Sequence, residues 1–143
     1  MIINPIFFCS KIILSFSKNL IKAEGLSTKM GKRVILGLTA EITLFSSDGQ
    51  EIKVIGRIDT GATASSIDSN LAKQLCLGPI IKTKLIKSAS GNLKRPIVKS
   101  KLKLNGDIIE ADFSLADRSH MTYPVLVGQN ILKKGHFLID PKK

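Results

Sequence analysis

The segment Asp59-Thr60-Gly61-Ala62 contains the residue types and spacing most suited to chemistry. It follows the apolar run at residues 54–58, so the sequence predicts a strand that delivers a carboxylate into a tight loop. One such carboxylate can take a proton from water while a second, protonated carboxyl group polarises an amide carbonyl, since two acids in contact can share one proton. The chain has one such segment, so the second acid must come from elsewhere.

Each neighbour of Asp59 fits this interpretation. Gly61 lets the backbone turn and approach closely, and Thr60 offers a short hydroxyl that can fix the loop. Ala62 leaves room beside the acid. The alternative is an ordinary turn at the end of a strand, because Asp, Thr and Gly are common in turns for local reasons.

Three ordered blocks give the chain a wider resemblance, from about Val34 to Pro141. They are residues 56–66 (GRIDTGATASS), 123–128 (YPVLVG) and 137–141 (FLIDP). In this order and spacing they resemble the retropepsin-like aspartic peptidase family known as the ATP-dependent zinc proteases, small proteins often encoded beside ATP-grasp glutamate ligases. The chain departs from the family at two positions, with Asp68 where a His is frequent and Gln129 where an Arg is frequent.

The resemblance implies a fold and a set of site residues. The implied fold is all-β, a retropepsin-like (acid protease) closed barrel-like domain with one short helix. Ser65 and its neighbour Ser66 are close enough in sequence to hydrogen-bond the Asp59 carboxylate or the neighbouring loop, although both could be solvated. Arg118 could contact substrate or anchor a dimer, with a surface salt bridge to a nearby Asp as the alternative. The expected catalytic residues are Asp59, Thr60 and Gly61, and the expected substrate-binding residues are Ala62, Ser65, Ser90, Gly91 and Arg118.

Hydrophobic alternation and turn signals predict many short strands. Strands are expected over residues 33–45, 51–58, 80–89, 93–104, 109–115 and 123–127, with hairpin turns at 46–49 and at Asn105-Gly106. A short helix over 70–75, capped by Ser69, and a helical turn over 129–133 interrupt them. The small residues 88–92 fall where a retropepsin-like protein has its flap, and a plain β-turn is the alternative.

Size and charge limit the partners. A chain of 143 residues builds one ordinary domain and is too short for a two-lobed peptidase that carries both acids, so a homodimer is expected. The net charge of +11 favours acidic partners, such as a glutamate-rich polypeptide. Nucleic acid is the competing partner, but with no Trp and one Tyr the chain lacks the aromatic ladder that stacks single-stranded bases.

The sequence offers little for a metal, a cofactor or a disulfide framework. Cys9, Cys76, His120 and His136 show no close ligand spacing, and no Gly-x-x-x-x-Gly-Lys-Ser/Thr loop is present. We therefore expect no metal and no cofactor. Two distant cysteines favour a reducing cytoplasm.

Residues 1–29 precede the resemblance and are expected to be a mobile leader or an over-extended start, with the peptidase domain over 30–143. Lysines interrupt the apolar runs, so a membrane-spanning helix is not expected. An amphipathic surface helix over 11–22 is the alternative.

The sequence therefore predicts a cytoplasmic aspartic endopeptidase in which two Asp59 carboxylates of a homodimer activate water, acting on polypeptides and without nucleic acid or membrane as partner. The alternative is a peptide-binding or adaptor module on the same fold that does not cut its ligand. A basic RNA-binding β domain is a third hypothesis.

Overall fold

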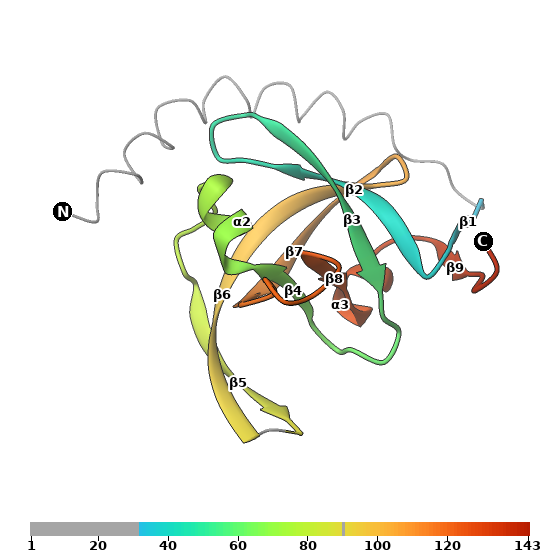
Figure 1. Ribbon diagram of the computed structural model, residues 1–143. Coiled ribbons are helices and arrows are strands. Elements are labelled where there is room, and N and C mark those ends of the chain that lie inside the picture. The colour runs from blue at the N-terminus through green and yellow to red at the C-terminus, as the bar shows by residue number, and fades with distance from the viewer. Residues whose placement is uncertain (1–31, 90) are drawn as a thin grey trace.

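The computed structural model describes residues 32–89 and 91–143 (Figure 1). The expectations for the leader at 1–29, for Cys9 and for Ser90 lie outside these residues. The strands are β1 (Val34–Leu36), β2 (Thr39–Phe45), β3 (Glu51–Ile58), β4 (Ser65–Asp68), β5 (Lys82–Ser88), β6 (Gly91–Leu104), β7 (Asp107–Ala116), β8 (Val125–Val127) and β9 (Phe137–Ile139). The helices are α2 (Ser69–Gln74) and α3 (Gln129–Leu132).

Six strands form a closed barrel, in the order β2-β3-β8-β4-β7-β6, and β6 pairs back with β2 to complete it. Alternate residues of these strands point inward, as the period of a strand requires. The inward residues include Ile42, Val98 and Phe113, all fully buried, and they form one continuous apolar core. The predicted all-β, retropepsin-like barrel is therefore confirmed.

The strand β6 is longer than the barrel needs. Its first part pairs with β5 in a hairpin that projects from the barrel, with the register Ser88 to Gly91 at the tip (Figure 1). This hairpin is the predicted flap segment, and it is named the flap hairpin below. The other end of β6 leads into a turn at Asn105 and Gly106. Their φ angles of 50° and 96° are those of the two-residue hairpin that Asn-Gly predicts.

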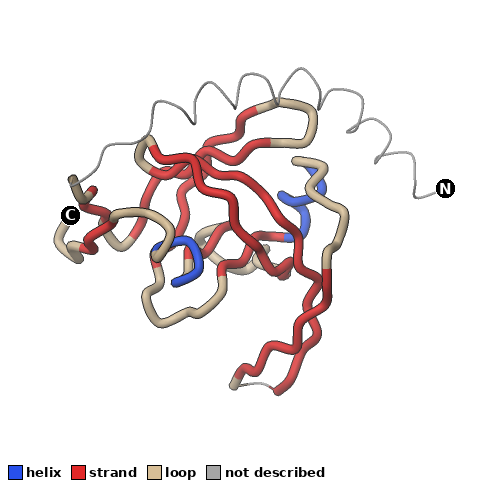
Figure 2. The backbone as a smooth tube through the Cα atoms, turned by 180° about the vertical axis from the view of Figure 1, so that it is seen from behind, coloured by secondary structure: helices blue, strands red, loops and turns tan. Residues whose placement is uncertain are grey.

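Two short helices flank the strands on opposite sides (Figure 2). The second is the predicted helical turn after Gly128. The first begins one residue earlier than expected, because Asp68, rather than Ser69, is the N-cap. The Asp68 side chain accepts a hydrogen bond from the backbone N of Leu71, as an N-cap residue does.

The predicted strand over 33–45 is two strands, with a break at Gly37 and Leu38. The first of them, β1, leaves the barrel and pairs in parallel with β9 near the C-terminus. Gly37 permits this because a Cβ there would lie 2.7 Å from the carbonyl oxygen of Lys143. Within the described residues no helix has the length and apolar character needed to span a membrane.

Candidate active site

Asp59 directly follows β3 and continues its pairing with β8, since its backbone N donates to Val127 O at 2.9 Å. Its side chain lies on the outer face of the barrel, because the preceding Ile58 points into the core and successive side chains alternate. The backbone N of Gly61 donates to Asp59 Oδ1 at 2.9 Å. The carboxylate is thus oriented by its own loop while remaining half-exposed.

The start of α3 holds the loop that follows Asp59. The backbone N of Gln129 donates to Ala62 O at 2.8 Å, and the backbone N of Asn130 donates to Thr63 O at 3.2 Å. The Gln129 side chain adds a third bond, from Nε2 to Thr60 O at 2.8 Å. Gln129, one of the departures from the family pattern, therefore braces the loop directly.

Gly128 allows α3 and the loop to come this close. A Cβ at Gly128 would lie 2.7 Å from the carbonyl carbon of Ala64 and 2.8 Å from the carbonyl oxygen of Ala62. Such distances are well below ordinary van der Waals contact. The glycine is therefore required by packing between two segments about 65 residues apart in the chain.

Of the alternatives considered for Ser65, neither a hydrogen bond to the Asp59 carboxylate nor a solvated hydroxyl is observed. Its hydroxyl donates to Asn130 Oδ1 at 2.6 Å and accepts from the backbone N of Gly128 at 2.9 Å. Asn130 Nδ2 in turn donates to Asp112 O at 2.9 Å. Ser65 is fully buried, so this network ties α3, β4 and β7 together beneath the loop.

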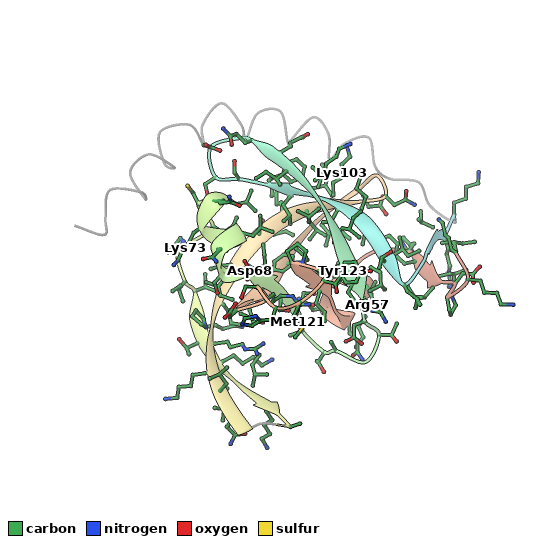
Figure 3. The ribbon with its side chains drawn as sticks, in the orientation of Figure 1. Arg57, Asp68, Lys73, Lys103, Met121 and Tyr123 are labelled. Atoms are coloured by element: carbon green, nitrogen blue, oxygen red, sulfur yellow. The ribbon has the colours of Figure 1, made fainter. Side chains whose placement is uncertain are left out.

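Arg118 lies across the outer face of the same sheet. Its Nη1 donates to Ser66 Oγ at 3.1 Å and its Nε donates to Tyr123 O at 3.0 Å. Its backbone N donates to Oδ1 of Asp68, which lies at the start of α2 (Figure 3). The alternative of a surface salt bridge to a neighbouring Asp is wrong within the described residues, since Arg118 has no carboxylate within 4.0 Å there.

The electrostatics of Arg118 reflect this position. Burial lowers the pKa of its guanidinium, the positive charge of Arg95 lowers it further, and the carboxylate of Asp68 raises it. Asp68, the second departure from the family pattern, thus caps α2 and also holds the loop of Arg118.

The expected site residues that the structure describes lie in three places, one of which is the position of Arg118 against Ser66 and Tyr123. Residues 59–62 and Ser65 meet at the ends of β3 and β8, where the loop packs on α3. Gly91 lies at the tip of the flap hairpin, with a φ of 120° and open space around it. Within residues 32–89 and 91–143 no group of three His, Cys, Asp or Glu side chains could hold a metal ion, so the described residues do not fit the zinc in the name of the resembled family.

Family membership follows from the second half of the chain. Residues 68–143, just over half of the sequence, match the family described as RimB-like, retropepsin-like aspartic endopeptidase RimB. The chain belongs to this family. The matched region contains the flap hairpin, β7, β8 and α3, and begins after the Asp59 loop. No curated protein matches the sequence of the RimB-like chain.

Solved structures share the fold of the RimB-like chain at low sequence identity. A protein of unknown function from Legionella pneumophila is 20% identical with a TM-score of 0.59, over 78% of this chain and 96% of that one. EIAV protease in complex with an inhibitor is 19% identical with a TM-score of 0.55, over 76% and 93%. Simian foamy virus protease is 20% identical with a TM-score of 0.50, over 66% and 91%.

Sequence reasoning assigned no role to three residues of the site region in the RimB-like chain. Asn130 and Gln129 follow Gly128 directly, and their position after an apolar strand was the available signal. Arg95 has no such signal, because only the strand register brings it toward Arg118.

Proposed function

We propose that the chain is an aspartic endopeptidase in which Asp59 carboxylates from two copies activate water against a peptide bond. One carboxylate takes the proton of the water, and the other, protonated, donates a hydrogen bond to the scissile carbonyl oxygen. Membership of a retropepsin-like endopeptidase family supports a peptidase role. Asp59 as the acid, the second copy and the substrate are the parts that this proposal adds.

The observation that carries the proposal is the setting of Asp59. Its carboxylate accepts from Gly61 N, and its loop is fixed by three hydrogen bonds from the start of α3. Catalytic groups need such preorganisation, since small displacements reduce rate strongly. The carboxylate nonetheless stays half-exposed on the outer face, where a second carboxylate and a substrate can reach it.

A second copy is proposed because the sequence holds one Asp-Thr-Gly segment. The two-stranded sheet of β1 and β9 offers a surface for it. Ile35 and Leu138 are cross-strand partners there, and each is 46% exposed. Burial of these side chains against their copies would favour a twofold dimer, the commonest closed assembly.

The proposed substrate is an extended polypeptide with acidic residues. Lysines at 82, 84, 87 and 94 make the flap hairpin strongly basic, and all four are exposed. An acidic peptide lying between this hairpin and the Asp59 loop would be attracted by that charge.

The test compares the full chain as wild type, Asp59→Asn and Asp107→Asn. The last is a matched control, because it makes the same chemical change at the β6–β7 turn. Each protein is given a broad peptide library containing glutamate-rich members, from acidic to neutral pH, with and without a chelator. We expect cleavage by wild type and by Asp107→Asn, none by Asp59→Asn, and no effect of the chelator.

Cleavage that survives Asp59→Asn would contradict the assignment of the acid. Cleavage that the chelator abolishes would contradict the metal-free mechanism. A folded wild-type dimer that binds peptides without cutting them would replace the proposal with the peptide-binding module.

A further inference from the structure

Two arginines approach each other on the outer face of the sheet. The charge of Arg95 on β6 is near enough to Arg118 to lower the pKa of its guanidinium, second only to burial as a cause. Arg118 is held in place by Ser66 and Tyr123, so it cannot easily swing away. Two like charges kept together in a partly buried place cost stability unless an anion lies between them.

Arg95 supplies an independent sign of an absent partner. Its Nε atom is buried and has no hydrogen-bond partner among residues 32–89 and 91–143. Buried donors are almost always paired, and an unpaired one costs free energy. Directly across the hairpin from Arg95 is Lys84, whose exposed amine adds a third positive charge on the same face.

None of the carboxylates within residues 32–89 and 91–143 fills this place. Asp112 pairs with Lys82 at 3.7 Å and with Lys99 at 3.4 Å. In the described part of the chain neither Arg95 nor Arg118 has a carboxylate within 4.0 Å. The missing acceptor would therefore come from a ligand.

The strand register relates this pair of arginines to Asp59 across the outer face, with Arg95 and Asp59 at opposite ends of one row of paired residues. One row of cross-strand partners runs over the outer face from the flap hairpin to β3, through Ile97, Ser114, Ser66, Leu126 and Arg57. Arg95 is two residues from one end of this row, on the same face as Ile97.

Asp59 is two residues beyond the other end of that row, also on the outer face. Strands about 4.8 Å apart and a rise of about 3.3 Å per residue put the backbone of Ser66 roughly 12 Å from that of Asp59. An extended peptide covers that distance in three to four residues. Arg118, which contacts Ser66, is therefore within reach of a substrate side chain a few residues from the bond at Asp59.

We propose that Arg95 and Arg118, assisted by Lys84, bind a carboxylate of the polypeptide substrate and so determine specificity for acidic residues. Guanidinium groups suit this role, since their planar N–H groups match carboxylate oxygens in paired hydrogen bonds. The inference rests on the proposed peptidase function and adds the residues that select its substrate. The carboxylate is either an acidic side chain or the C-terminal carboxylate of the peptide.

The experiment measures kcat/KM of the full chain for matched peptides that differ by Glu or Gln at one position. Each peptide is made with a free and with an amidated C-terminus. We expect wild type to prefer Glu by roughly 10- to 100-fold, the value of a charged hydrogen bond. If the preference depends on the position of Glu, the bound carboxylate is the Glu side chain. If it depends only on a free C-terminus, the bound carboxylate is the terminal one.

Arg95→Gln tests the site without disturbing the fold, because Arg95 Nε has no partner in the described structure to lose. We expect this variant to keep the unfolding midpoint of wild type while the preference falls toward one. Arg95→Lys keeps the positive charge but loses the paired N–H groups of the guanidinium, so it should retain part of the preference for Glu. Lys103→Gln is the control, because it removes one positive charge from an exposed position at the far end of β6, away from the flap hairpin.

Equal cleavage of Glu and Gln peptides by wild type would overturn the inference and leave the peptidase function standing. An equal fall of the preference in Arg95→Gln and Lys103→Gln would overturn it too, because only the general charge would then matter. If wild type cuts no peptide, fluorescence anisotropy with Asp59→Asn measures binding of the same peptides. Selective binding of the carboxylate that Arg95→Gln removes would support the site, and unselective binding would overturn it.

Discussion

Replacing Gly128 by Ala tests whether close packing of α3 positions the Asp59 loop. Gly128 has a φ of −99°, which any residue can adopt, so backbone strain does not contribute. The added Cβ would lie 2.7 Å from the carbonyl carbon of Ala64 and 2.8 Å from the carbonyl oxygen of Ala62. To restore ordinary contact, the loop and α3 must separate by about 1 Å.

This displacement has a cost in stability and a larger one in activity. Overpacking of this kind lowers the free energy of unfolding by about 1–3 kcal/mol. A shift of about 1 Å at a catalytic group can reduce kcat/KM by about 100-fold. The assay combines denaturant unfolding, peptide cleavage and the NMR shifts of the amides of Gly61 and Gln129, which report the loop and its contact with α3.

Gly106→Ala is the control for stability alone. Gly106 lies in the β6–β7 turn with a φ of 96° and no atom within 4 Å of a new Cβ, so its replacement costs roughly 1–2 kcal/mol through backbone strain. We expect it to lose stability without changing the site amides or kcat/KM. A Gly128→Ala protein with the stability, amide shifts and cleavage of wild type would refute the packing argument.

Two further predictions concern hydrogen bonds. Asn130→Ala should lower the free energy of unfolding by about 1–3 kcal/mol, because it leaves the Ser65 hydroxyl and the Asp112 carbonyl oxygen unpaired. Asn92→Ala, at an exposed position, should change the free energy of unfolding little. Denaturant unfolding measures both variants. The Ser119 side chain, then its backbone N, lower the pKa of Asp117. The folding stability that these hydrogen bonds contribute is present above the usual carboxyl pKa and is lost as pH falls through the lowered pKa of Asp117. Ser119→Ala should therefore raise the pKa of Asp117, which an NMR titration measures.

Local sequence signals predicted the strand that precedes Asp59 and the turn between β6 and β7. The apolar run before Asp59 gave the strand, and Asn105-Gly106 gave the hairpin, because each depends on residues next to it. Sequence proximity indicated the Asp59 carboxylate, its loop or solvent as the partner of the Ser65 hydroxyl. Its actual partners, Gly128 and Asn130, are 63 and 65 residues away, a distance that a local pattern does not contain.

The break between β1 and β2 has a similar cause. Val34 and Ile35 alternate as a strand should, but β1 pairs with β9, at the other end of the chain. The contact of Arg118 with Ser66 likewise depends on the register that pairs β4 with β7. Long-range pairing decided these features, so single-sequence reasoning reached the elements and not their contacts.

The central claim is that one active site needs two Asp59 carboxylates, and mixing of subunits tests it most directly. Wild type and Asp59→Asn are co-purified after random exchange at several ratios, and total cleavage is measured at fixed protein concentration. If both copies must supply the acid, activity falls as the square of the wild-type fraction, to about one quarter at an equal mixture. A linear fall to about one half would show that each chain acts with its own acid and would contradict the account.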